Sequence, residues 1–300
     1  MPSTIQAWLS AFRLRTLPLA FSSIILGAFL AAKEGAFNGG IFAFSLLTTL
    51  FLQVLSNLAN DYGDYMKGTD NEARVGPSRT VQAGLISPNA MKIAIVLFSI
   101  LSLVSGNGLL YFAGAFSDMV ILGFFLGVGL FCILAAITYT VGSNAYGYKG
   151  LGDISVLLFF GLVGVLGTHF LMAHQFMAIN ILPALSCGLL AVGVLNLNNL
   201  RDIENDRASG KRSIPVMIGY EKGKIYHYIL IVLSIVFLSI YLFSTFSNWL
   251  QLLPMILFPL YVFHILKVKS TLINRELDPF LKQLALISLA TSLFFGIGLL

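Results

Sequence analysis

The chain has 300 residues, of which 57% are hydrophobic and only 10% are charged, with a net charge of +5. Soluble domains carry about 25% charged residues, so this composition excludes an ordinary soluble protein and indicates a polytopic membrane protein. The basic residues do not alternate with aromatic residues as in nucleic-acid-binding proteins, and we expect no nucleic-acid partner. Cys132 and Cys187 lie inside apolar runs without CxxC spacing, which indicates neither a metal site nor a disulfide framework.

A transmembrane helix needs about 20 mostly apolar residues, and nine stretches meet this requirement. They cover residues 17–33, 41–59, 92–112, 119–138, 154–172, 178–198, 227–244, 249–266 and 281–299. The sequence therefore predicts an all-α membrane protein with nine spans, forming a single domain over residues 1–300. The first stretch also has features of a cleaved signal peptide. We expect it to be retained, because its removal would leave eight spans.

The distribution of basic residues predicts the orientation. If the N-terminus is cytoplasmic, all 18 basic residues except Lys33 fall on the cytoplasmic side. The positive-inside rule favours this arrangement, with the C-terminus outside the cell. We expect a multi-pass protein of the inner cell membrane, with its longer polar connections at the cytoplasmic face.

Two acidic clusters follow apolar spans on that face. Each contains an asparagine and an aspartate four residues apart, namely Asn60 and Asp64 in the first and Asn198 and Asp202 in the second. The remaining acidic residues of the clusters are Asp61, Asp70, Glu72, Glu204 and Asp206. The matched spacing at the ends of the second and sixth spans predicts an internal repeat of two four-span halves followed by a ninth helix.

Helical geometry predicts which of these side chains act together. Residues four apart share one face of a helix, so Asn198, Asp202 and Asp206 form one stripe, and Asn60 and Asp64 form another. Gly68 can end the second span and let Asp70 turn back toward Asp64.

Oxygen ligands without histidine or cysteine favour a hard cation, and two facing stripes predict a Mg²⁺ site that binds a diphosphate. The alternative is a solvated loop in which carboxylates pair with neighbouring lysines and arginines. Glu72 and Glu204 fit that alternative, and Asp61 is intermediate because it lies about 100° from the face of Asp64. Nearby basic residues suit the same diphosphate as charge partners. They are Arg74, Arg79, Lys211 and Arg212.

A third polar connection, residues 139–153, lies on the same predicted face and ends where the fifth span begins. One interpretation is that it binds the head group of a substrate, through Tyr139, Tyr146, Lys149 and Asp153. The alternative is an ordinary interfacial loop with an aromatic belt. Arg13 and Arg15, in front of the first span, are interpreted as orientation anchors, with contact to an anionic substrate as the alternative.

The two acidic motifs resemble those of the UbiA superfamily of intramembrane prenyltransferases. The matching segments are NDYGDYMKGTD followed by GPSRTVQAG, and NNLRDIENDRASGKRS. Together with YTVG, YGYKGLGD and the RTLP start, they are most similar to the 1,4-dihydroxy-2-naphthoate polyprenyltransferase branch. The resemblance covers essentially the whole chain.

The resemblance implies nine helices around a central cavity, with Mg²⁺ joining the motif residues to a polyprenyl diphosphate. Carried over to this sequence, its metal ligands are Asn60, Asp64, Asp70, Asn198, Asp202 and Asp206, and the aspartates most directly tied to catalysis are Asp64, Asp202 and Asp206. Many members space the first motif as NDxxDxxxD, whereas this chain has Gly68 at the last position and Asp70 two residues later.

The implied reaction is prenyl transfer to 1,4-dihydroxy-2-naphthoate with loss of CO₂, giving demethylmenaquinol. The implied partners are the polyprenyl diphosphate, the naphthoate and membrane lipid. One alternative is a related transferase that uses another aromatic acceptor, such as 4-hydroxybenzoate. Another, from a different class, is a transporter of divalent cations or phosphorylated lipids that uses the same carboxylates as an ion path.

Overall fold

The computed structural model describes residues 4–71, 75–77 and 79–300. Over these residues, nine helical segments are long and apolar enough to cross a membrane, and no strand is present. The segments run over Thr4–Lys33, Gly39–Met66, Pro88–Phe112, Met119–Thr138, Gly152–Ala173, Ala178–Arg201, Tyr220–Ser244, Trp249–Ser270 and Asn274–Leu299. The predicted all-α fold with nine spans is therefore confirmed.

Some spans are single helices and others are built from shorter pieces. The continuous ones are α3 (Gly39–Met66), α4 (Pro88–Phe112), α5 (Met119–Thr138), α8 (Ile181–Arg201), α11 (Tyr220–Ser244) and α13 (Asp278–Leu299). The first span joins α1 (Thr4–Phe12) to α2 (Leu17–Lys33). The fifth joins α6 (Gly152–Val156), a π-helical stretch (Leu157–Gly167) and α7 (Thr168–Ala173), and the eighth joins a 3₁₀ stretch (Trp249–Leu257) to α12 (Phe258–Ser270). Two short helices, α9 (Ile203–Ala208) and α10 (Ile214–Ile218), lie between α8 and α11.

Local sequence accounts for several helix ends. The side chain of Asn38 accepts a hydrogen bond from the amide of Ile41 at 3.1 Å and begins α3. Ser87 does the same for Ala90 at 3.2 Å, and Pro88 occupies the first turn of α4, where its missing N–H is not needed. These caps position the helices that carry the polar connections.

The helices of the first two spans extend beyond the apolar runs from which the spans were predicted. Helix α3 continues to Met66, about two turns past the expected end at residue 59. It therefore carries Asn60 and Asp64 on an ordered helix that projects beyond the apolar run. The first span also begins earlier than expected, with α1 separated from α2 by a turn at Arg13, whose φ of 49° lies in the left-handed region.

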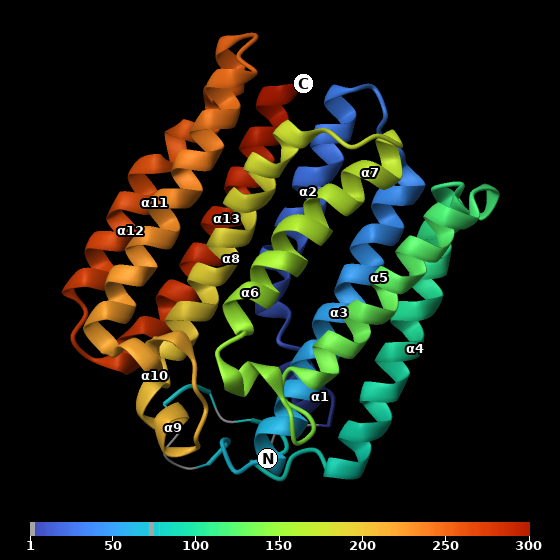
Figure 1. Ribbon diagram of the computed structural model, residues 1–300. Helices are drawn as coiled ribbons and strands as arrows, with labels where there is room; N and C mark the ends of the chain where they lie inside the picture. The colour runs from blue at the N-terminus through green and yellow to red at the C-terminus, as the bar shows by residue number, and fades with distance from the viewer. Residues whose placement is uncertain (1–3, 72–74, 78) are drawn as a thin grey trace.

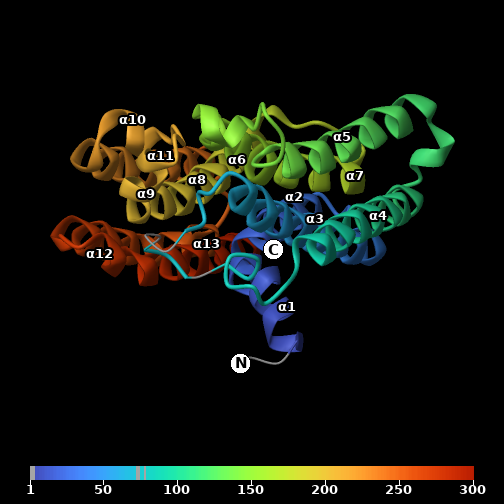
Figure 2. The same cartoon turned by 90° about the horizontal axis from the view of Figure 1, so that it is seen from below.

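Figure 1 shows the two termini at opposite ends of the bundle, with α9 and α10 near the N-terminal end. Helix α3 packs along α4, and α8 packs along α11. These pairs join the second span to the third and the sixth span to the seventh. Helix α13 packs on α2, so the last span closes against the first. Helix α1 projects to one side when seen from below (Figure 2) and packs on α3 through Ala7 and Ala11.

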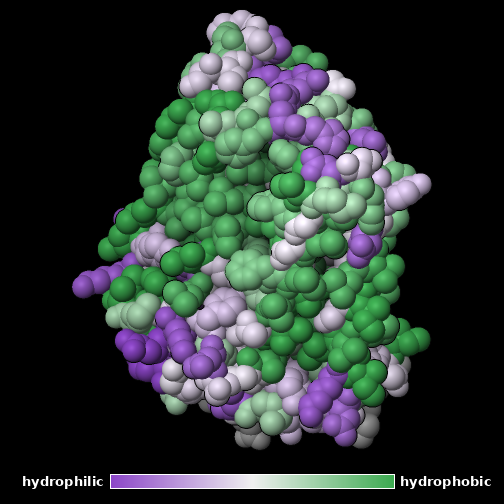
Figure 3. Space-filling model, turned by 45° about the vertical axis from the view of Figure 1, so that its right-hand side comes forward, coloured by the Kyte–Doolittle hydropathy of each residue, from purple (hydrophilic) through white to green (hydrophobic). Residues whose placement is uncertain are grey.

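The outer surface is largely apolar, as expected of a multi-pass membrane protein. Figure 3 shows one face on which hydrophobic side chains dominate and hydrophilic ones gather mainly toward the two ends, with a hollow near the middle. On α5, for example, Val120 is 81% exposed and Phe124 is 64% exposed. Such exposure of large apolar side chains suits lipid as the surrounding solvent.

A cavity of about 370 Å³ lies mainly among the first five spans, with Leu195 of the sixth span also in its wall. Its wall is mostly apolar, with side chains such as Ile24, Leu110, Phe125 and Phe160. The cavity extends along α3 as far as Asn60, so its inner end meets the first acidic motif.

Candidate active site between the two acidic motifs

The first motif lies at the end of α3. Gly68 has a φ of 70°, a conformation that glycine adopts without the usual steric penalty. The chain consequently turns back, and the amides of Thr69 and Asp70 donate to the carbonyl of Asp64 at 3.0 and 3.3 Å. This geometry confirms that Gly68 ends the helix and returns Asp70 to Asp64.

The second motif passes through a break between α8 and α9. Helix α8 ends at Arg201, yet the amide of Asp202 still donates to the carbonyl of Asn198 at 3.2 Å. The amide of Asp206 donates to the carbonyl of Asp202 at 2.9 Å. The four-residue spacing is thus preserved across the break, and Asn198, Asp202 and Asp206 follow one another one turn apart, as predicted.

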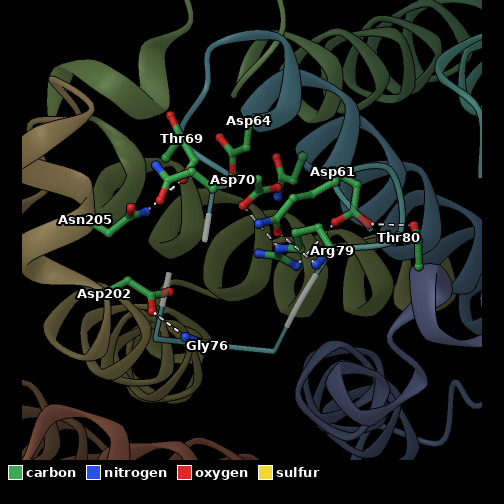
Figure 4. A network of polar contacts seen from close by, with 12 residues as sticks. Asp61, Asp64, Thr69, Asp70, Gly76, Arg79, Thr80, Asp202 and Asn205 are labelled. Carbon is green, nitrogen blue, oxygen red and sulfur yellow. Dashed lines mark hydrogen bonds and ion pairs between the residues drawn. The ribbon is translucent and has the colours of Figure 1, made fainter. Parts of the chain in front are cut away.

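The structure brings the two motifs together, although they are far apart in sequence. The amide of Gly76 donates to Oδ1 of Asp202 at 3.0 Å, and the side-chain amide of Asn205 donates to the carbonyl of Thr69 at 2.8 Å. Figure 4 shows these contacts between the loop after α3 and the α8–α9 region. Asp64, Asp70, Asp202 and Asp206 are each at most 5% exposed.

Asp61 has a different environment from its neighbours. It is 1% exposed and pairs with Arg13, and it also lies 3.3 Å from Nη1 of Arg79. Its second oxygen accepts from the hydroxyl of Thr80 at 3.1 Å. These contacts tie α3 to the N-terminal segment and to the following loop.

The other carboxylates have cationic or phenolic partners. Asp64 accepts from the hydroxyl of Tyr148 at 2.7 Å, and Asp70 lies 3.7 Å from Nε of Arg79. Asp206 lies 3.6 Å from Nζ of Lys211. Burial lowers the pKa of Arg79 to about 10, an effect that the charge of Asp202 opposes, so its guanidinium is still positive at neutral pH.

The donor set fits Mg²⁺, which prefers carboxylate and amide oxygens. Over residues 4–71, 75–77 and 79–300, however, no three His, Cys, Asp or Glu side chains are grouped closely enough to hold a metal ion together. Asn60 instead accepts from the hydroxyl of Thr140 at 3.2 Å. Binding of Mg²⁺ would therefore require the motif side chains to exchange their present partners for the ion.

The predicted diphosphate ligands differ in their burial and in their contacts with the motif carboxylates. Arg79 and Lys211 are largely buried and contact the motif carboxylates. The side chain of Arg212 is exposed, and its backbone amide donates to the carbonyl of Tyr148 at 3.1 Å. Arg74, together with Glu72, lies outside the described residues. Glu204 pairs with Arg207 at 3.1 Å on the surface, as expected of a solvated carboxylate.

The connection between α5 and α6 divides into residues that line the cavity and residues that do not. Tyr139 and Tyr146 line it, with ring centroids 5.2 Å apart. The hydroxyl of Tyr146 donates to the carbonyl of Ala135 at 3.0 Å. Lys149 and Asp153 are not among the residues that line the cavity. Lys149 is exposed and donates to Asn144 at 3.0 Å, whereas Asp153 accepts from the hydroxyl of Tyr226 at 2.8 Å.

Several residues of the site were not selected from the sequence. Gln53, Ser56 and Asn57 line the cavity on α3, and the spacing from Gln53 through Asn57 and Asn60 to Asp64 is a readable helical stripe. Tyr148 is a further residue of the site, because its hydroxyl donates to Asp64. Arg201 is adjacent to Asp202 in the sequence, and the structure places its guanidinium on that carboxylate.

Comparison with known proteins gives matches over nearly the whole chain. The model of the UbiA prenyltransferase family matches residues 20–290. Proteins named 1,4-dihydroxy-2-naphthoate octaprenyltransferase, from Haemophilus influenzae and Escherichia coli, are each 44% identical to this chain, covering 99% of it and 96% of the relative. A solved structure of a UbiA homolog from Archaeoglobus fulgidus, bound to DMAPP and Mg²⁺, is similar in fold, with a TM-score of 0.61 at 17% identity over 95% of this chain and 99% of that one.

Proposed function

Because the chain belongs to the UbiA prenyltransferase family, we propose that it transfers a polyprenyl group from polyprenyl diphosphate to 1,4-dihydroxy-2-naphthoate. The ring carbon that bears the carboxylate attacks the allylic carbon, the diphosphate leaves with the bonding electrons, and CO₂ is lost to give demethylmenaquinol. The observation that carries this proposal is the 44% identity, over 99% of the chain, to two relatives named for this activity. In this proposal residues 1–300 act as one prenyltransferase domain.

The two acidic motifs are the proposed diphosphate site. Asn60, Asp64, Asp70, Asn198, Asp202 and Asp206 would hold Mg²⁺, which when bound neutralises the diphosphate and eases its departure. Their convergence through the contacts of Gly76 and Asn205 supports this assignment. Arg79 and Lys211 already face the motif carboxylates and would contact the diphosphate as charge partners.

The cavity is the proposed chamber for the hydrocarbon tail and the acceptor. Its apolar wall excludes water, which would otherwise capture an allylic cation. Tyr139 and Tyr146 line the same cavity as Asn60, where an aromatic acceptor would meet the diphosphate-bearing carbon. We also propose that this mouth and the N-terminus are cytoplasmic, in the inner membrane, with the C-terminus outside.

The proposal is tested with purified protein in detergent, Mg²⁺, a labelled prenyl diphosphate and 1,4-dihydroxy-2-naphthoate. We expect a prenylated, decarboxylated naphthoquinol that is lost when EDTA is added. A parallel reaction with 4-hydroxybenzoate distinguishes the acceptors. Preference for that acceptor would reject the naphthoate assignment, and metal uptake into proteoliposomes without any turnover would favour a transporter.

Substitutions separate the proposed site from the neighbouring surface. Asp64→Ala and Asp202→Ala should each lower kcat by at least about a hundredfold, because each removes a charge from the diphosphate site. Glu204→Ala is the matched control and should stay within about twofold, because an exposed ion pair contributes little. Near-normal turnover in both aspartate variants would refute the assignment.

A further inference from the structure

The guanidinium of Arg201 lies directly on oxygens of the second acidic motif. Its Nε and Nη2 donate to the two carboxylate oxygens of Asp202 at 3.1 and 2.7 Å, and Nη2 also donates to Oδ1 of Asn198 at 2.8 Å. Arg201 is only 1% exposed. A buried guanidinium fork on a carboxylate is among the strongest polar contacts in proteins.

These oxygens are the ones that the proposed function assigns to Mg²⁺, so this inference rests on that proposal. Mg²⁺ binds oxygen at about 2.0–2.1 Å and demands near-octahedral geometry. A guanidinium and a divalent cation cannot share the same lone pairs, and their positive charges repel. Arg201 therefore competes with a metal ion for Asn198 and Asp202, and withdrawal of its guanidinium would free the acceptor sites that it occupies.

Asp278, the first residue of α13, provides a place for the displaced guanidinium. Nη1 of Arg201 already donates to Oδ1 of Asp278, so Arg201 can release Asp202 without losing every partner. The other oxygen of Asp278 lies 3.7 Å from Nη1 of Arg15. Asp278 is one-third exposed at its side chain, which leaves it accessible for a closer contact.

The loop that follows the first motif covers the guanidinium. A Cβ on Gly76 would lie 2.5 Å from Nη2 of Arg201, a distance that does not occur between real side chains, and the Gly76 amide donates to Asp202. Movement of Arg201 would therefore change the packing of the loop after α3, which contacts the second motif through Gly76. Both Arg201 and the Gly76 amide donate to the carboxylate of Asp202, and Gly76 lies against the guanidinium of Arg201.

We propose that Arg201 and Asp278 form a cation-exchange pair, in which Arg201 neutralises the second motif and is transferred to Asp278 when Mg²⁺ binds. Arg201 competes with the ion, and Asp278 lowers the cost of its withdrawal. Both are positioning residues, because they act through Asn198 and Asp202. The two substitutions therefore have opposite effects on metal affinity.

The test measures binding of Mn²⁺, which is visible by electron paramagnetic resonance, to the full-length protein without prenyl diphosphate. Arg201→Gln should bind Mn²⁺ about tenfold more tightly than the wild type, and Asp278→Asn about tenfold more weakly. The double variant should behave like Arg201→Gln, because Asp278 acts only through Arg201. The matched controls are Arg207→Gln and Glu276→Gln, which alter exposed side chains and should stay within about twofold.

The outcomes separate this inference from the proposed function. Weaker Mn²⁺ binding in both single variants, or a double variant unlike Arg201→Gln, would indicate a structural ion pair and overturn the exchange pair. Mg²⁺-dependent turnover with unchanged Mn²⁺ affinity in all variants would overturn the exchange pair alone. Turnover that survives EDTA in the wild type would overturn the metal role and this inference with it.

If Arg201→Gln fails to fold, Arg201→Lys and Asp278→Asn carry the same comparison. The lysine should compete less with the metal ion, because it lacks the guanidinium fork.

Discussion

Tyr148 connects the two motifs at the level of single side chains. Its hydroxyl donates to Oδ1 of Asp64, and the hydroxyl of Thr69 lies 2.6 Å from it. The Nζ atoms of Lys67 and Lys211 lie 4.5 and 5.8 Å from the centre of its ring. Burial, assisted by the charge of Asp64, raises the pKa of Tyr148, so the phenol stays protonated and remains a donor well above neutral pH.

Tyr148→Phe should therefore raise the Mg²⁺ concentration needed for half-maximal turnover by about tenfold, since a residue that orients a metal ligand typically contributes that much. The maximal rate at saturating Mg²⁺ should change only a few-fold. Metal titration of the initial rate is the measurement. Tyr65→Phe, on an exposed tyrosine of α3 next to Asp64, is the matched control and should leave the titration unchanged. An unaltered metal requirement in Tyr148→Phe would show that the phenol does not orient Asp64.

At the scale of helices, small residues let the first, fifth and sixth spans approach closely. A Cβ on Gly27 would lie 2.4 Å from the carbonyl oxygen of Val165, and one on Gly161 would lie 3.1 Å from Cα of Gly188. Transmembrane helices associate through such small residues because lipid offers no hydrophobic driving force between them. The first, fifth and sixth spans, which all contribute to the cavity wall, thus meet each other at glycines.

Gly27→Ala should destabilise the protein by about 1–3 kcal/mol, because the added methyl group meets rigid backbone. Gly123→Ala is the matched control on α5, where a Cβ would meet nothing within 4 Å. It should stabilise the helix by about 0.5–1 kcal/mol, since alanine loses less conformational entropy than glycine. Thermal unfolding in detergent should shift in opposite directions for the two variants. A shift of the same sign in both would contradict the close contact.

The elements also show what the sequence could predict and where it could not. Hydropathy located all nine spans, because apolar length is set by the bilayer. It misplaced the end of α3, because the helix continues through polar residues to Met66. The Asn-x3-Asp spacing identified the stripes, whereas the roles of Asp61 and Arg201 depend on partners distant in sequence, such as Arg13 and Asp278. Single-sequence patterns do not record such pairings.

At the scale of the whole molecule, the two halves of the chain contribute unequally to the site. Most of the cavity wall comes from the first five spans, and the sixth contributes Leu195. The later spans form a packed hydrophobic wall whose core contains large buried side chains such as Tyr241, Tyr261 and Phe295. The second motif enters from that wall on α8 and α9. A shared site therefore requires both motifs on one side of the membrane, as their direct contacts indicate.

The orientation can be measured with single cysteines in a background that lacks Cys132 and Cys187. Ser143→Cys reports on the α5–α6 connection and Ser117→Cys on the α4–α5 connection, and both positions are exposed. A membrane-impermeant maleimide should label Ser117→Cys in intact cells and Ser143→Cys only after the membrane is disrupted, because the basic residues are expected inside. The reverse pattern would invert the proposed topology.

The apolar, hollowed face in Figure 3 also bears on the concentration at which the protein meets its proposed donor. A polyprenyl chain dissolves in the bilayer, so the protein meets it at a mole fraction of lipid, whereas Mg²⁺ and the acceptor's charged group are met at an aqueous concentration. Adding detergent or lipid at constant total donor dilutes the donor within its own phase. The apparent affinity for the donor is therefore a two-dimensional quantity, and it should scale with the amount of amphiphile in the assay even when nothing in the protein has changed.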